Sequence, residues 1–201
     1  MLTLNVVATL TEPMLGTVPK NREIYTKYIE SEKIKRADQD RGTKEAETVP
    51  VDENQGWTGF HSDEQGLFVY DYLIKGALKN AANVLKDSLK QKNLRSKFDN
   101  CVFVFPRKVR ILGDQDAPLE KPDGMVERPL RAMTMQGPRV TLARSDSVNA
   151  GRKMRFEIRC IETDQIKEMR KTLDVCMEYW QLCGFGQFRN GSYGRATVEV
   201  E

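Results

Sequence analysis

GRKMRFEIRCIETDQIKEMRKTLDVCMEYWQLCGFGQFRNGSYGRATVEVE, residues 151–201, is the most informative stretch of this chain. Apolar residues alternate with charged ones over residues 154–160, which predicts a half-buried strand. They then recur every three or four positions over residues 166–180, which predicts an amphipathic helix capped by Thr163. Alternation returns over residues 196–200. The stretch therefore predicts a strand, a helix, a glycine-rich loop and a second strand.

The upstream sequence repeats these patterns. LTLNVVATL (2–10) alternates as a half-buried strand, and an apolar stripe over residues 74–89 predicts a helix. CVFVFPRKVRIL (101–112) predicts a strand that Pro106 breaks or confines to an edge. The order strand, helix, strand, strand, helix, strand is the split βαβ arrangement. We therefore predict an α+β, ferredoxin-like or RRM-like fold, with a four-stranded antiparallel sheet and two helices on one face.

Two long insertions interrupt this order within a single expected domain, residues 1–201. The first, about 13–66, has no sustained period, although WTGFHSDEQGLFVY (57–70) is typical of a hairpin. The second, about 113–151, contains four prolines and short strand-like pieces around QGP. We interpret it as an extended hairpin arm. Loops of this length inside a compact domain are usually functional or disordered.

Composition excludes several classes of protein. The longest strongly apolar run is CVFVF (101–105), far short of the roughly 20 residues of a membrane helix. The N-terminus lacks a signal-peptide pattern. The four cysteines have no C-x-x-C spacing, so we interpret them as reduced thiols in a cytoplasmic protein without a metal site. We expect no cofactor, because no Walker motif, nucleophile elbow or metal-ligand cluster occurs.

The net charge is only +3, yet the charges are unevenly distributed. Residues 126–159 contain eight basic residues, seven of them arginine, and only three acidic ones. Arginine suits forked contacts with phosphate and stacking on bases. A solvated face and an anionic partner both explain this pattern.

Glycines are concentrated in the loop that precedes the last predicted strand. They are Gly184, Gly186, Gly191 and Gly194. Without a Cβ, their backbone amides can approach a phosphate or a sugar. Arg189 and Arg195 add charge, and Phe185, Phe188 and Tyr193 add rings for base stacking. The alternative is a helix ended by Gly184 and an ordinary turn whose aromatics pack in the core. Taken alone, the loop favours this turn.

Two local signatures resemble a known family. One is IKGALKNAA (74–82) at the head of the first helix, and the other is GFGQFRNGSYGR (184–195) before the last strand. Together they resemble the RAMP superfamily of CRISPR-associated proteins, above all the crRNA-binding backbone subunits of type I and type III effector complexes. The lead-in YDYLIKGAL is bulkier than the small-residue segment of those subunits. A stand-alone or phage-borne relative would fit the same resemblance.

The resemblance implies a non-catalytic protein that holds single-stranded, guide-like RNA such as crRNA. It also implies assembly with further copies or with Cas-like subunits, as a part of antiviral defence. In the family, the hairpin arm lies across the guide and interrupts its base stacking. Met133 and Met135 are the candidate wedge residues here, and the alternative is that they pack the arm against the body. The RNA-binding residues implied are Lys75, Lys79, Arg128, Arg131, Arg139, Arg144, Gly186, Arg189, Gly191, Tyr193, Gly194 and Arg195.

Two other functions remain open. A metal-independent endoribonuclease would use His61 as an acid or base, or an aspartate of the first insertion. The aspartates there are Asp38, Asp40, Asp52 and Asp63. An incidental surface histidine is the simpler interpretation of His61. The third function is a protein-interaction decoy that enters a CRISPR effector complex without holding RNA.

Overall fold

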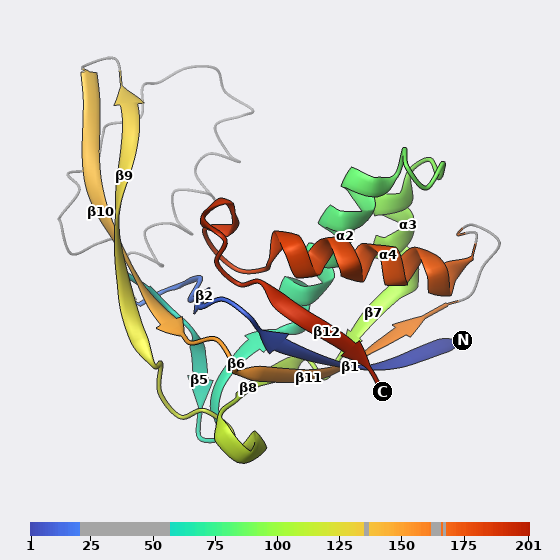
Figure 1. The fold of residues 1–201 in the computed structure, drawn as a ribbon, viewed down its shortest axis with the longest axis horizontal. Coiled ribbons are helices and arrows are strands. Elements are labelled where there is room, and N and C mark those ends of the chain that lie inside the picture. The colour runs from blue at the N-terminus through green and yellow to red at the C-terminus, as the bar shows by residue number, and fades with distance from the viewer. Residues whose placement is uncertain (21–56, 135–136, 162–165, 167) are drawn as a thin grey trace, which may run out of the picture.

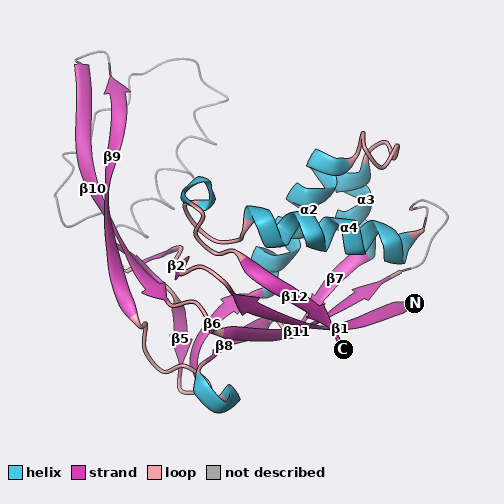
Figure 2. Ribbon diagram, in the orientation of Figure 1, coloured by secondary structure: helices cyan, strands magenta, loops and turns pink. Residues whose placement is uncertain are grey.

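The computed structural model describes residues 1–20, 57–134, 137–161, 166 and 168–201. In this part, a sheet covered by helices forms the body, and a long hairpin arm extends away from it (Figure 1). The α-helices of the body lie on one face of the sheet, a short 3-10 helix (Asp114–Asp116) lies apart from them, and the arm consists of strands (Figure 2).

The core of the sheet has the predicted strand order. Its strands run antiparallel in the order β12-β1-β11-β7. Their bounds are Ala196–Val200 for β12, Leu2–Leu10 for β1, Lys153–Cys160 for β11 and Val102–Phe105 for β7. Two helices, α2 (Asp71–Leu85) and α4 (Met169–Cys183), connect these strands. This is the split βαβ arrangement, so the α+β, ferredoxin-like fold is confirmed.

The sheet is wider than the four predicted strands. The segment predicted as one strand divides at Pro106 into β7 and β8 (Lys108–Leu112), and both pair with β11. A proline has no N–H for a strand ladder, which explains the break. On its other side β8 pairs with β6 (Gly66–Tyr70), and β6 pairs with β5 (His61–Asp63).

The helices differ from prediction at their ends. α2 ends at Leu85, before the predicted stripe ends at Leu89, and a further short helix, α3 (Leu94–Cys101), buries Leu94 and Phe98 against it. α4 begins at Met169, and the predicted cap Thr163 lies outside the described residues. The predicted stripes are nevertheless the buried faces of both helices, because the sheet covers the apolar side of each.

The core joins both helices to the sheet through large side chains. Trp180 of α4 is 2% exposed, and its ring lies 5.9 Å from Phe156 of β11 and 5.2 Å from Phe185. Fully burying an aromatic side chain of this kind contributes about 2–3 kcal/mol. This packing anchors the end of α4, and with it the start of the glycine-rich loop.

The arm is a hairpin of β9 (Gly124–Thr134) and β10 (Gly137–Val148), paired from Ser147↔Gly124 to Gly137↔Thr134. At its foot, β10 continues into a small second sheet. There it pairs with β2 (Met14–Leu15) and, in parallel, with β4 (Trp57–Gly59), which pairs with β3 (Val18–Pro19). The arm therefore stands on strands from the first insertion.

One buried carboxylate holds this second sheet together. Asp146 is 4% exposed and accepts hydrogen bonds from Lys20 Nζ (2.8 Å) and Trp57 Nε1 (2.9 Å). The backbone N–H of Lys20 also donates to the carbonyl of Trp57 (3.0 Å). The two positions that flank residues 21–56 are thus bonded to each other and to the arm.

Candidate nucleic-acid interface

The glycine-rich loop, residues 184–195, closes on itself at the end of α4. Gly184 has a φ of +73° and ends the helix as predicted, with its N–H donating to the carbonyl of Trp180 (2.8 Å). The N–H of Phe185 donates to the carbonyl of Gly194 (3.1 Å). A Cβ at position 184 would lie 2.6 Å from the carbonyl oxygen of Tyr193, and one at position 194 would overlap that of Phe185. The loop's own closure therefore requires both glycines.

The other two glycines also face atoms of this chain. A Cβ at Gly191 would overlap the ring of Phe188, and a Cβ at Gly186 would touch Met14 and the carbonyl of Leu15 at 3.4 Å. Gly186 further has a φ of +88°, which favours glycine. Internal packing thus accounts for Gly186, Gly191 and Gly194, and their predicted contact with RNA stays a prediction.

The aromatic residues of the loop divide into one core residue and one exposed pair. Phe185 is 1% exposed and packs on Trp180, so it is unavailable to a base. The expectation that Phe185 stacks on bases is therefore wrong, because the end of α4 directs this ring into the core. Phe188 is 43% exposed, and its ring centroid lies 5.8 Å from that of Tyr193. These two rings remain candidates for stacking.

The two arginines of the loop have neutral partners. Arg195 is exposed and donates from Nε to the carbonyl of Leu182 (2.9 Å), and Arg189 Nη1 lies 4.0 Å from the thiol of Cys183. In the described part of the chain, neither forms an ion pair with a carboxylate. Both therefore carry an uncompensated positive charge at the loop surface.

The loop contacts the foot of the arm through Gln187. Its Oε1 accepts hydrogen bonds from Thr58 Oγ1 of β4 (3.2 Å) and Ser145 Oγ of β10 (3.0 Å). Next to it, the guanidinium of Arg128, on β9, lies over the ring of Phe188 at 4.7 Å. Segments that are distant in sequence thus meet at one place, which we call the arm–loop junction (residues 58, 128, 145, 187 and 188).

The four predicted arginines of the arm differ in what the structure shows of them. Arg128 is 9% exposed and lies in the arm–loop junction. Arg144 forms an ion pair with Glu127, its register partner across the hairpin (Nε to Oε1, 2.6 Å). The side chains of Arg131, Arg139 and Met133, and all of Met135, lie outside the described residues, although the backbone register places Arg131 opposite Val140 and Arg139 opposite Ala132. The wedge role predicted for the two methionines stays a prediction.

The lysines at the start of α2 already have an anionic partner. Lys79 Nζ lies 2.8 Å from Asp99 Oδ2 on α3, and Lys75 Nζ lies 3.6 Å from Oδ1 of the same carboxylate. Lys75 also donates to the carbonyl of Asp99 and lies over the ring of Phe103. The hydrogen bond from Lys79 lowers the pKa of the Asp99 carboxyl. An RNA phosphate at this place would have to compete with Asp99.

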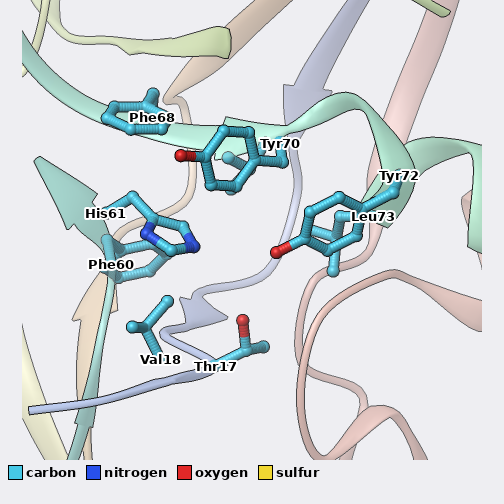
Figure 3. Close-up of a pocket in the computed structure, with 9 residues that line it drawn as sticks. Thr17, Val18, Phe60, His61, Phe68, Tyr70, Tyr72 and Leu73 are labelled. Carbon is cyan, nitrogen blue, oxygen red and sulfur yellow. The ribbon is translucent and has the colours of Figure 1, made fainter. Parts of the chain in front are cut away.

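His61 lines a small pocket among aromatic rings (Figure 3). Its ring stacks on Phe68 (centroids 5.4 Å apart) and meets Tyr70 edge-on (4.6 Å). Burial lowers the pKa of His61, which favours the neutral imidazole, a form that suits a base better than an acid. The described lining carries no carboxylate or amine, and the cavity, about 20 Å³, has room for a water molecule but not for a nucleotide.

Asp63 is the one candidate nuclease aspartate that the structure describes, and two cations already bind its carboxylate. Asp63 accepts hydrogen bonds from Arg110 (Nη2 to Oδ2, 2.9 Å) and Lys108 (Nζ to Oδ2, 2.8 Å). These bonds, the one from Arg110 most strongly, lower the pKa of the Asp63 carboxyl. Asp38, Asp40 and Asp52 lie outside the described residues. Among the residues that are described, no group of three or more His, Cys, Asp or Glu side chains is placed to hold a metal ion.

Sequence reasoning missed a second group of rings and cations. Phe68, Tyr70 and Tyr72 form a continuous series, with Tyr70 and Tyr72 stacked at 5.4 Å. Lys108 lies over Phe68 (4.8 Å) and Arg107 over Tyr70 (5.7 Å). The signal was present in the alternating aromatics of FVYDY (68–72) and the basic PRKVR (106–110), whose strands pair. The arm–loop contact of Gln187 had no sequence signal.

No protein-family model matches the sequence, and no curated protein matches it either. Known structures do match the fold. One is a chain in the cryo-EM structure of the type III-B Cmr-beta bound to cognate target RNA, with a TM-score of 0.52 and 13% identity over 98% of this chain. The chain spans 60% of the length of that protein.

A chain in the structure of a type IV-B CRISPR complex also matches. Its TM-score is 0.52 and its identity 9%, over 100% of this chain and 90% of that one. At such identities the likeness establishes the fold alone, which this chain shares with subunits of CRISPR complexes. In addition, none of the described helices is long and apolar enough to cross a membrane.

Proposed function

We propose that this protein binds single-stranded, guide-like RNA without cleaving it, as a CRISPR-related protein of the RAMP type that assembles with further copies or with Cas-like subunits. The observation that carries the proposal is the arm–loop junction. There the hairpin arm and the glycine-rich loop, the two elements that the RAMP resemblance assigns to RNA, are in direct contact through Arg128 and Phe188. The fold shared with chains of CRISPR complexes, one of them bound to target RNA, supports the same function.

The chemistry near the junction suits an unpaired strand. Arg189 and Arg195 carry charges without carboxylate partners in the described part of the chain, and the rings of Phe188 and Tyr193 are partly exposed. Cations attract the phosphates of an RNA strand, and exposed rings stack on its bases. Stacking depends little on the base sequence, because every base has a flat face. We therefore expect binding that depends steeply on salt and weakly on base sequence.

Fluorescence anisotropy with a short fluorescein-labelled single-stranded RNA tests this proposal. We expect the double substitution Arg189→Glu with Arg195→Glu to weaken binding by about 100-fold at low salt, since each reversal removes an attraction and adds a repulsion. The matched control is Arg170→Glu with Lys171→Glu, the same charge change on exposed residues of α4. Equal losses in both double variants would show that only net charge matters and would contradict a local site.

The decoy alternative predicts a different result from the same preparation. A protein that only contacts other subunits purifies without nucleic acid and does not shift labelled RNA at low salt. The ratio of absorbance at the nucleic-acid and protein maxima, measured together with size by gel filtration, separates the two functions. RNA that remains bound to the purified protein without being shortened supports a non-catalytic RNA-binding role.

A further inference from the structure

We propose that Arg128 and Phe188 form a phosphate-and-base clip, in which an RNA phosphodiester pairs with the guanidinium of Arg128 and the adjacent unpaired base stacks on Phe188. The clip lies at the foot of the arm, where β9 meets the glycine-rich loop. It rests on the proposed function and specifies which group of the RNA is recognised, and by which side chains.

The guanidinium of Arg128 is buried, and no described residue forms an ion pair with it. The residue is 9% exposed, and its Nε and Nη1 atoms have no hydrogen-bond partner in the described part of the chain. Removing a charge from water is costly unless an opposite charge or hydrogen bonds replace the water. Desolvation by this burial lowers the pKa of Arg128.

Several other arginines with restricted exposure have carboxylate partners. Arg152 pairs with Asp123, Arg110 with Asp63, and Arg144 with Glu127. Arg128 is the most buried of these four, and it faces a ring instead of an acid. A cation over an aromatic face is attracted to it but keeps its unused N–H donors. The geometry therefore leaves room for an anion from outside the described chain.

Phe188 is held in place beside this guanidinium. It has a φ of +55°, a left-handed conformation that is strained for a residue with a side chain. Its ring covers Gly191, where a Cβ would overlap it, and it lies 4.7 Å from Arg128 Cζ. The ring is nonetheless 43% exposed. Such a ring is a preorganised stacking surface next to a cation.

These two features together identify the ligand class. Arginine binds phosphate oxygens with two parallel hydrogen bonds, and an exposed ring binds the face of an unpaired base. A phosphodiester with its base supplies both groups at neighbouring positions. A protein carboxylate would satisfy Arg128 but would leave the exposed ring of Phe188 unused. Single-stranded RNA is therefore the ligand that the junction fits.

The test measures RNA binding by anisotropy over a range of salt concentrations for several variants. We expect Arg128→Met to weaken binding about 10-fold and to reduce the slope of log K against log salt by about one, since one phosphate contact is lost. Arg128→Lys should be intermediate, because lysine keeps the charge and loses the fork. Phe188→Ala should weaken RNA binding without changing the slope of log K against log salt, because it removes a ring and no charge. The control is Arg170→Met, which removes an exposed, paired arginine of α4.

Thermal unfolding distinguishes recognition from a structural role. Without RNA, Arg128→Met should melt at or above the temperature of the wild type, because the variant no longer buries an unpaired charge. With RNA, the wild type should gain more thermal stability than the variant. A lower melting temperature of the RNA-free variant would assign Arg128 to the fold and overturn the clip.

The remaining outcomes separate the clip from the proposed function. If the wild type fails to bind RNA at low salt, the proposed function itself fails, and the clip with it. If the wild type binds RNA and Arg128→Met behaves like the control, the clip is wrong while RNA binding stands. If Arg128→Met binds RNA normally but dissolves an assembly in gel filtration, the anion is a protein carboxylate, and the clip is again wrong.

Discussion

Two arginines at the foot of the arm have opposite surroundings. Arg152, just before β11, donates from Nη2 to Asp123 Oδ1 (2.6 Å) and from Nε to Oδ2 (3.0 Å), and this pairing raises the pKa of Arg152. Arg128, on β9, has no acid beside it in the described chain, and burial lowers its pKa. Arg152 therefore links the residue directly before β9, Asp123, to the residue directly before β11 at the base of the hairpin.

The contrast shows how one residue type serves two purposes. An ion pair with good geometry and both members in the chain contributes to the stability of the fold. Removing either member leaves the other as a buried, unpaired charge. An arginine without an internal partner adds nothing of this kind to the fold and is available to an external anion. The burial of an arginine thus indicates a structural role only when its partner is known.

The largest effect on stability is expected from breaking the ion pair between Arg152 and Asp123. Arg152→Met should lower the free energy of unfolding by about 2 kcal/mol, because Asp123, whose side chain is 11% exposed, is left without its partner. Arg128→Met should not lower the free energy of unfolding. Urea denaturation of both variants measures the difference. Equal losses would remove the distinction between the two arginines.

A smaller effect is expected from pH. The Arg152 guanidinium, through its hydrogen bonds, holds the pKa of the Asp123 carboxyl below its ordinary value of 3.8, so the folded state binds fewer protons than the unfolded one in that window. The pair's contribution is therefore complete above about pH 5 and is lost as pH falls from there through the folded pKa. Asp123→Asn should lack this part of the pH dependence. The unfolding free energies of wild type and variant, compared across acidic pH, would converge if the prediction holds and stay parallel if it does not.

The smallest effect on stability is expected from Gly191→Ala. The added Cβ would overlap the ring of Phe188, and the ring, being partly exposed, should swing away from Arg128. We expect a change in unfolding free energy of about 0.5 kcal/mol, with RNA affinity lowered as in Phe188→Ala. Gly113→Ala, where a Cβ would meet no atom closer than 3.4 Å, is the matched control. Unchanged RNA affinity in Gly191→Ala would show that the position of Phe188 is irrelevant to binding.

The core of the fold followed from periodicity in the sequence. Strands β1, β11 and β12 and the buried stripes of α2 and α4 lie where alternation and helical spacing predicted them. The hairpin predicted within 57–70 is formed by β5 and β6, but its addition to the main sheet through β8 had no local sequence signal, because that pairing joins distant segments. Helix α3 was missed because its eight residues contain only three that are buried.

The candidate site was predictable in its residue types and less so in its contacts. Arg128 and the loop aromatics were identified from composition and resemblance, yet which ring enters the core depends on the position of Trp180 in the last turn of α4. The pairing of Lys75 and Lys79 with Asp99 joins separate helices, and no local pattern encodes that contact. Sequence thus indicates which side chains are available, and tertiary packing decides which of them are already engaged.

The bonded pair Lys20 and Trp57 has a consequence for how the chain tolerates changes in length. The two positions are held together by a backbone hydrogen bond and by Asp146, so contacts among described residues already fix their spacing in the second sheet. For a flexible connection, each doubling of length costs only about 0.6 kcal/mol in closure entropy. The connection between Lys20 and Trp57 is therefore a natural place to graft or shorten a segment while the arm and the main sheet stay intact.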